Sequence, residues 1–178
     1  MSKIKTIKAR EILASGGAPT LEVTITLESG SVGEASVSYG ASAGSHEATV
    51  LLDGDQNRYK GKGMLTAINN INTTISQALI GMEASEQRKI DEKMISLDGT
   101  ENKAKLGGNA ILGVSMAVAR AQAVEEGLPL YKYLQKTFNL VPVNNLPKPM
   151  IVMIEGGKHA ADSTDLQEYL VSAMGNRS

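Results

Sequence analysis

Hydrophobic and polar residues alternate over the first forty positions of the chain. Apolar residues occupy every second position in 21–27, with glutamate or threonine between them. A period of two is typical of a strand with one buried face. Ile4–Leu13 and Val32–Val37 can supply strands on either side, through the turn sequences at 15–19 and 28–31. The pattern predicts a three-stranded antiparallel meander.

The hydrophobic period changes to that of a helix after Gly63. Apolar residues recur at helical spacing in 64–79 and again in 90–97. A third helix is predicted over 110–126 with Asn109 as its N-cap, and its small apolar residues lie on most faces, as in a helix buried on several sides. Strands first and helices second indicate an α+β fold, in which a meander precedes a helical bundle.

The third helix is expected to be the packing centre of its domain. Gly127 and Pro129 are its stop signals, and a short helix follows at about 130–138. Leu112 is expected in the core, where a large-to-small substitution costs about 2–5 kcal/mol when the side chain is fully buried.

A proline-rich stretch predicts a boundary near residue 140. Residues 139–149 hold three of the five prolines. The chain is therefore divided into a domain at 1–140, a linker at 141–149 and a tail at 150–178. In the tail, 150–154 and 166–173 are strand-like, and two strands do not make a domain.

Composition narrows the classes of function. The 178 residues carry 18 Lys+Arg and 19 Asp+Glu, a formal net charge of −1, without long blocks of one sign. No nucleic-acid or membrane-surface partner is therefore expected. There is no cysteine, which excludes disulfides and thiol nucleophiles. Without an apolar leader or a run of roughly 18 apolar residues, a cytoplasmic location is expected.

Two short polar clusters are weak candidates for chemistry. His46 and Glu47 lie together in a glycine-rich loop, where they can act as acid and base on loop closure or simply be solvated. Asp53 and Asp55 flank Gly54 but lack the further ligands of a calcium loop, so they are expected to shape a turn.

Longer motifs carry a family resemblance. In order along the chain they are GASAGSHEA (40–48), DGDQNRYKGKG (53–63), LDGTENKAKLGGNAILGVSMAVARA (97–121), and GGKH (156–159) followed by LQEY (166–169). Together they closely resemble enolase, the phosphopyruvate hydratase of glycolysis, over essentially the whole chain. The resemblance implies an enolase N-terminal domain at 1–140 and a remnant of the (β/α)₈-type barrel domain at 150–178.

The resemblance also implies a reaction and some of its residues. Enolases dehydrate 2-phosphoglycerate to phosphoenolpyruvate with Mg²⁺, using a lysine base. Ser42 matches the loop serine at the second Mg²⁺. His159 matches a histidine near the substrate phosphate, and Glu168 matches an acidic residue near the leaving hydroxyl. Gln167 precedes it as in the family and is the third substrate-binding candidate. Each can instead have a purely structural role in this chain. The family's base lysine, three carboxylate ligands and proton-donor glutamate belong to later barrel strands and have no counterpart here.

Several site positions depart from the family pattern. Enolases usually read Asp-Ser-Arg-Gly-Asn-Pro-Thr where 14–20 reads ASGGAPT, so this loop is expected to be looser. Tyr39 stands where serine is usual, and Val152 and Glu155 stand where asparagines are usual. A carboxylate at Glu155 is expected to repel a phosphorylated acid.

The sequence leaves three hypotheses for function open. The first is an enolase-like protein that is inactive as this chain alone. The second is one half of a split enolase, completed by a partner chain that supplies the remaining barrel strands. The third is a non-enzymatic binding or regulatory module on the enolase N-terminal fold, which associates with itself as a homodimer or with a full-length enolase.

Overall fold

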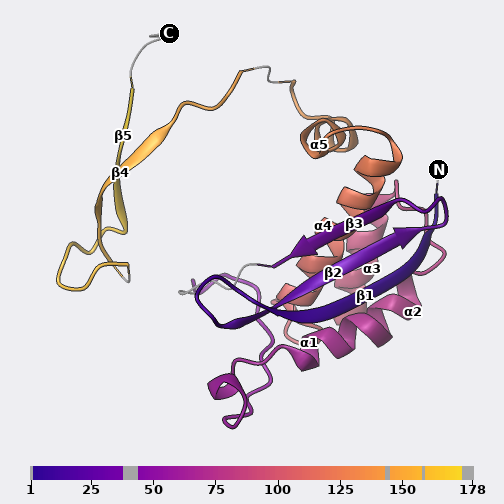
Figure 1. The fold of residues 1–178 in the computed structure, drawn as a ribbon, viewed down its shortest axis with the longest axis horizontal. Helices are drawn as coiled ribbons and strands as arrows, with labels where there is room; N and C mark the ends of the chain where they lie inside the picture. The colour runs from indigo at the N-terminus through magenta and orange to yellow at the C-terminus, as the bar shows by residue number, and fades with distance from the viewer. Residues whose placement is uncertain (1, 38–43, 143–144, 158, 174–178) are drawn as a thin grey trace. The chain divides into compact units, whose positions relative to one another are not determined.

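The computed structural model describes residues 2–37, 44–142, 145–157 and 159–173. Contacts divide the chain into two units, Met1–Leu140 and Val141–Ser178. The first unit holds a three-stranded sheet and the helices found among the described residues, and the second holds a two-stranded hairpin (Figure 1).

Three antiparallel strands form the sheet of the first unit. They are β1 (Ile4–Leu13), β2 (Pro19–Leu27) and β3 (Val32–Ser36), in the order β1-β2-β3. The apolar residues at every second position of β2 are fully buried, while Glu22, Thr24 and Thr26 between them are not. The predicted meander is confirmed, and its central strand has the predicted alternation.

Helices cover one face of this sheet (Figure 1). In chain order the helical segments are the short 3₁₀ turn η1 (Tyr59–Gly61), α1 (Leu65–Asn70), the π-helical segment η2 (Ile71–Ile75), α2 (Ser76–Leu79), α3 (Gln87–Asp98), α4 (Gly108–Glu125) and α5 (Leu130–Phe138). The main core between sheet and helices is made of isoleucine, leucine, valine, alanine and methionine side chains. The α+β class predicted from the sequence is therefore confirmed.

Helix α4 packs against the sheet, but it begins earlier than predicted. Its N-cap is Gly107, and Asn109 lies inside the first turn with its side chain buried. The Asn109 Oδ1 accepts a hydrogen bond from the backbone N–H of Leu51 (3.1 Å), and its Nδ2 donates to the Leu51 carbonyl (3.2 Å). The prediction of Asn109 as the N-cap is wrong, because its amide is used to bind the 48–52 loop to the helix.

The expectation that Leu112 lies in the core is also wrong. Its side chain is 50% exposed, whereas the neighbouring Ile111 is 6% exposed. Leu112, Arg120 and Val124 are exposed at a spacing of four or eight residues, so they share one stripe of α4. The helix is buried on most faces, and this stripe is left uncovered within the first unit.

Glycines allow α4 to approach the sheet closely. A Cβ at Gly33 on β3 would lie 2.8 Å from the Ala121 Cα, and closer still to the Ala121 nitrogen and the Ala117 carbonyl oxygen. A Cβ at Gly113 on α4 would lie 2.9 Å from methyl groups of Leu21 and Val23 on β2. The helix backbone therefore rests almost directly on strands β2 and β3.

The two outer edges of the sheet differ. At the β1 edge, Asn72 of the π-helical segment pairs with Ala9: its Oδ1 accepts from the Ala9 N–H (2.8 Å) and its Nδ2 donates to the Ala9 carbonyl (3.1 Å). Further along, the Ile4 N–H donates to the Met82 carbonyl and the Ile4 carbonyl accepts from the Gly81 N–H, both at 2.9 Å. The edge of β1 is thus covered by groups that do not belong to a strand.

The second unit is an antiparallel hairpin of β4 (Met150–Glu155) and β5 (Glu168–Ser172). Every residue of both strands is exposed within the described structure. This includes apolar side chains on successive positions of β4, such as Ile151 (62%) and Met153 (63%). The predicted strands are present, and neither face of the hairpin is covered within its own unit.

No helix among the described residues is long and apolar enough to cross a membrane.

We expect Ile111→Ala and Leu112→Ala to differ sharply in their effect on stability. Ile111 is buried, so its truncation should lower the free energy of unfolding by about 2–5 kcal/mol. Leu112 is half exposed, so the same truncation should cost less than about 1 kcal/mol. Urea unfolding followed by circular dichroism measures both, and equal losses would contradict this view of α4.

The close approach of α4 predicts that Gly33→Ala destabilises the first unit. The added methyl group meets backbone atoms of α4, which cannot rotate away, so we expect a loss of about 1–3 kcal/mol. Gly16→Ala is the matched control, because no atom lies within 4 Å of its Cβ position. A Gly33→Ala protein as stable as the control in thermal unfolding would show that the helix has room to move.

Candidate functional site

A polar cavity lies between two loops of the first unit. Ser45, His46, Glu47 and Ala48 line one side, residues 101–103 line the other, and the volume is about 520 Å³. The Thr49 N–H donates to the Asn102 carbonyl (2.8 Å), which holds the two loops together. The cavity brings an imidazole, carboxylates and a lysine to one surface. It therefore offers donors and acceptors to a polar ligand.

Glu47 has a local role as well as a place in this cavity. Its Oε1 accepts a hydrogen bond from the Gly44 N–H (2.8 Å), which forms a turn over 44–47. The two roles considered for His46 and Glu47, acid–base action on loop closure and simple solvation, both stay predictions. The structure adds that both face the 101–103 loop across the cavity.

The 101–103 loop is held by a buried carboxylate, Asp98. Its Oδ2 accepts from the Leu106 N–H (2.6 Å), and its Oδ1 accepts from the Thr100 N–H (3.0 Å) and from the Thr100 hydroxyl. Burial by itself raises the pKa of Asp98, but these hydrogen bonds to the charged form outweigh burial, so the pKa lies below its ordinary value of 3.8. Asp98 thus closes the loop that forms one wall of the cavity.

A second group of charges fixes the segment before α1. The Arg58 guanidinium donates to both carboxylate oxygens of Glu11 on β1, through Nη1 at 3.0 Å and through Nη2, and lies 3.6 Å from Asp53. The bond from Arg58 is the main cause that lowers the pKa of Glu11 below its ordinary value. Glu11 also accepts from the Met64 N–H (2.8 Å), so the cluster fastens the start of α1 to the sheet.

Asp55 shapes a turn, as predicted, whereas Asp53 does not act locally. Asp53 accepts from the N–H groups of Leu65 (3.0 Å) and Thr66 (2.7 Å), and so acts as a cap for α1 from a distant loop. Asp55 accepts from the Asn57 N–H (2.9 Å) in a turn.

Three residues of the predicted site lie in the second unit. The Gly156 N–H donates to the Gln167 carbonyl (2.8 Å), and the His159 N–H donates to the Gly156 carbonyl (3.1 Å), so His159, Gln167 and Glu168 all belong to the closed end of the hairpin. All three are exposed. Ser42, the predicted ligand of the second Mg²⁺, lies outside the described residues, as does Tyr39.

Glu155 is directly opposite Glu168 in the β4–β5 register. Residues paired across two antiparallel strands share one face of the sheet, so these two carboxylates repel each other. This pairing places a second negative charge beside the residue predicted to lie near the leaving hydroxyl. It makes this end of the hairpin more acidic than the resemblance implies.

A comparison with protein families identifies the first unit. Residues 4–134 match the family described as "Enolase, N-terminal domain". The chain belongs to the enolase family. In this enolase-family chain the match begins at β1 and ends within α5, so it covers the sheet, the Asp98 loop and the Glu11–Arg58–Asp53 cluster.

Sequence reasoning missed several polar residues of this domain. Arg58 lies within the motif at 53–63, but nothing local indicates that its partner is Glu11 on a distant strand. Gln87 and Asp91 on α3 line a smaller cavity of about 240 Å³, where the Gln87 Nε2 donates to Asp91 and to the Ser115 carbonyl, each at 3.1 Å. Burial raises the pKa of Asp91. The only sequence signal for this pair was their spacing of four on one helix.

We expect Asp98→Asn to destabilise the protein in a pH-dependent way. An amide has one acceptor oxygen and turns an N–H₂ group toward a donor, so the loss at pH 7 should be about 1–3 kcal/mol. The folded-state pKa is depressed, so the contribution of Asp98 is complete above the ordinary aspartate value and declines as the pH falls below it.

Urea unfolding of both proteins between pH 7 and pH 3 measures this difference. The gap between wild type and Asp98→Asn should narrow below about pH 4. Asp55→Asn is the control, because an amide oxygen can still accept from the Asn57 N–H. A gap that stays constant down to pH 3 would show that the charge of Asp98 is not what stabilises the loop.

Proposed function

We propose that this chain serves the enolase reaction, the Mg²⁺-dependent dehydration of 2-phosphoglycerate in cytoplasmic glycolysis, as a loop-bearing N-terminal domain that does not catalyse the reaction alone. The observation that carries the proposal is the match of residues 4–134 to the enolase N-terminal domain. The fold supports it, because the buried Asp98 holds the 101–103 wall of the polar cavity, and the Thr49 N–H joins the 45–48 wall to it through the Asn102 carbonyl.

Magnesium is the ion that the family implies, and the described residues do not fit a carboxylate-held Mg²⁺ by themselves. Within 2–37, 44–142, 145–157 and 159–173, no group of three or more His, Asp or Glu side chains could hold a metal ion. Mg²⁺ prefers oxygen ligands and near-octahedral geometry. In this proposal the metal takes its carboxylate ligands from outside these residues, and Ser42 contributes oxygens to the second Mg²⁺ only.

The residues of this chain then act in binding and orientation. In the proposal, His159 approaches the substrate phosphate and Glu168 lies near the leaving hydroxyl, with Gln167 beside it in the substrate-binding segment. The turn at 44–47 presents His46 and Glu47 to the 101–103 loop. The pairing of Glu155 with Glu168 disfavours a phosphorylated acid at this end of the hairpin, because like charges raise the electrostatic energy of the bound state. This supports a weak or absent substrate site in the chain alone.

The second unit favours a particular form of this proposal, in which other barrel strands complete the site. The β4–β5 hairpin exposes apolar side chains on both faces, and both of its outer edges have unpaired backbone groups within the described structure. Such a hairpin is marginally stable by itself in water. Pairing with further strands, from a longer chain or from a partner, would cover these faces and edges.

The test is a coupled assay for phosphoenolpyruvate with the purified chain, 2-phosphoglycerate and Mg²⁺. We expect no turnover above the protein-free blank, because the family's base lysine has no counterpart in this sequence and the described residues form no carboxylate metal site. Addition of a polypeptide that carries the remaining barrel strands of an enolase should then restore turnover. Turnover by the chain alone in the ordinary enzyme range, about 1–10³ s⁻¹, would overturn the proposal.

Two controls separate the parts of this proposal. The barrel polypeptide alone should be inactive. Ile154→Asp, which places a charge on the hairpin and leaves every residue of the first unit unchanged, should prevent the restored activity while the first unit unfolds as in wild type. If the unchanged chain neither binds the barrel polypeptide nor restores turnover, completion by further strands is wrong, whatever the chain does alone.

A further inference from the structure

The outer edge of β3 is unprotected, in contrast to that of β1. Asn72 and the 81–82 segment occupy the β1 edge. At the other end of the sheet order stands β3, and no described segment is paired with its outer side. A strand edge with free N–H and C=O groups can accept another strand.

The free backbone groups of β3 can be assigned from its ladder with β2. The Leu27 N–H donates to the Ser31 carbonyl (2.9 Å), and the Val37 N–H donates to the Leu21 carbonyl (3.0 Å). In an antiparallel pair, alternate residues bond to the same neighbour, so 31, 33, 35 and 37 bond to β2. The N–H and C=O groups of Val32, Glu34 and Ser36 therefore point outward.

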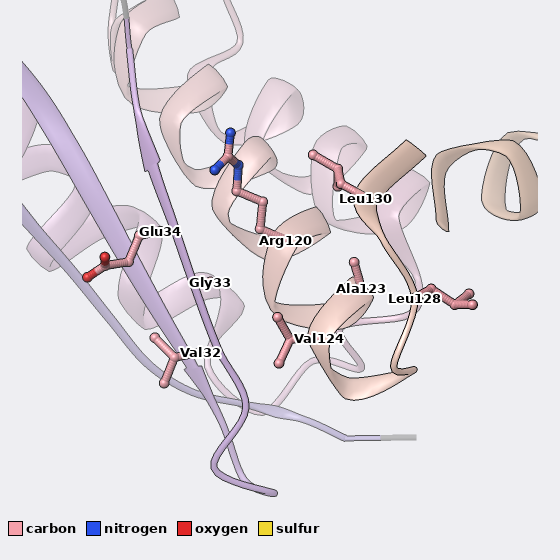
Figure 2. Close-up of a pocket in the computed structure, with 8 residues that line it drawn as sticks. All are labelled: Val32, Gly33, Glu34, Arg120, Ala123, Val124, Leu128 and Leu130. Carbon is pink, nitrogen blue, oxygen red and sulfur yellow. The ribbon is translucent and has the colours of Figure 1, made fainter. Parts of the chain in front are cut away.

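A groove of about 580 Å³ runs beside this edge. Figure 2 shows β3 on one side and α4 with the segment leading into α5 on the other. Val32, Gly33 and Glu34 line the strand side, and the helical side is lined by Arg120, Ala123, Val124, Leu128 and Leu130. Val124 is 58% exposed and belongs to the uncovered stripe of α4. The groove thus joins a free strand edge to an exposed apolar surface.

The charge in the groove comes from Arg120. Its guanidinium stands between β3 and the start of α5 (Figure 2), and it has no ion-pair partner within the part of the chain that the structure describes. Glu34 does not neutralise it, because its carboxylate turns to the opposite face of the sheet and accepts a hydrogen bond from the Thr24 hydroxyl (3.1 Å). A strand entering the groove therefore meets a positive charge.

The side-chain directions of β3 indicate which residue types suit a strand that pairs with its outer edge. Gly33 and Ala35 are buried toward α4, while Val32, Glu34 and Ser36 face the other side of the sheet. In a strand paired with β3, residues opposite Gly33 and Ala35 turn to the same side as these two, toward Arg120, Val124 and Leu130. These inward positions suit apolar and acidic side chains. The other positions face solvent.

A second copy of this chain fits the edge poorly. Antiparallel pairing of two β3 strands about Glu34 would place the two Glu34 carboxylates directly opposite each other on one face. It would also place Gly33 and Ala35 of the second strand at the inward positions, so neither Arg120 would receive an acid. The Glu34 pair is repulsive, and the charge of Arg120 stays uncompensated.

We propose that the β3 edge and its groove bind an extended peptide segment by strand addition, with inward-facing apolar residues on Val124 and Leu130 and an inward-facing carboxylate on Arg120. Backbone hydrogen bonds to Val32, Glu34 and Ser36 supply the pairing, and the alternate side chains supply the selectivity. The inference is independent of the enolase reaction, because the groove shares no residue with the polar cavity.

The test uses the full chain and a defined probe, the N-acetylated, C-amidated peptide Ser-Val-Thr-Glu-Thr-Val-Ser. Titration followed by ¹H–¹⁵N NMR should shift the amide signals of Val32, Glu34 and Ser36. Arg120→Gln should weaken binding about three- to tenfold, because it removes one charge-assisted contact. The same peptide with lysine in place of glutamate should bind the wild-type chain no more tightly than the unmodified peptide binds Arg120→Gln.

A proline variant separates backbone pairing from side-chain effects. Glu34→Pro removes an outward N–H while the ladder with β2 is kept, since proline is tolerated on edge strands, and it should abolish binding. Glu34→Ala loses the same side chain but keeps the N–H, and should bind as wild type does. N-methylation of alternate amides in the probe tests the same bonds from the ligand side, so the test holds even if Glu34→Pro fails to fold.

Three results would overturn the proposal. One is the absence of amide shifts in wild type at millimolar peptide. Another is an unchanged affinity in any of three comparisons with the wild-type chain and the unmodified peptide: the N-methylated probe, the lysine probe, or the Arg120→Gln chain. The third is self-association of the peptide-free chain in analytical ultracentrifugation that Glu34→Pro removes, which would assign the edge to a second copy.

Discussion

The close contact between α4 and the sheet is the constraint on which the rest of the first unit depends. Gly33 and Gly113 remove the side chains that would otherwise separate helix and strands, so the backbone of α4 lies directly on β2 and β3. Buried alanines on α4 keep this contact tight, and the aliphatic core fills the space around it. Protein interiors are close-packed, so a single methyl group added at such a contact lowers stability. The position of α4 in turn decides where its N-terminal loop and its exposed stripe lie.

The loops are then fixed by polar groups rather than by burial. Asn109 binds the 48–52 loop to the first turn of α4, and Asp98 closes the loop that leads into that turn. Arg58 does the same for the segment before α1, because it joins Glu11 on β1 to Asp53. A buried carboxylate is costly unless hydrogen bonds satisfy it. The carboxylates of Asp98, Glu11 and Asp53 are therefore held in the arrangement that makes these bonds. The loops around the polar cavity are therefore placed by the scaffold, while the side chains that line it remain accessible to a ligand.

The elements with a strong period were predictable, and those that depend on distant partners were not. The alternation in β2 and the helical spacing of 64–79 are local signals, and both structures formed as predicted. Asn109 has the residue type of an N-cap, but tertiary hydrogen bonds to Leu51 decided its role. Leu112 belongs to a nearly continuous apolar run, in which the sequence alone does not mark the face left uncovered. Arg58 with Glu11, and Asn72 with Ala9, join positions 47 and 63 residues apart, for which one sequence offers no signal.

The same distinction explains why family and mechanism are supported so differently in this chain. The motif at 97–121 carries the family resemblance because it builds the Asp98 loop and α4, which every function on this scaffold requires. The residues that the resemblance assigns to the substrate, such as His159 and Glu168, lie on a hairpin whose two strands are exposed within the described structure. The residues that show the family are thus those that pack the first unit, and a shared fold does not by itself establish activity. The open edge of β3 is the opposite case. The groove, the free backbone groups and the charge of Arg120 all belong to the first unit.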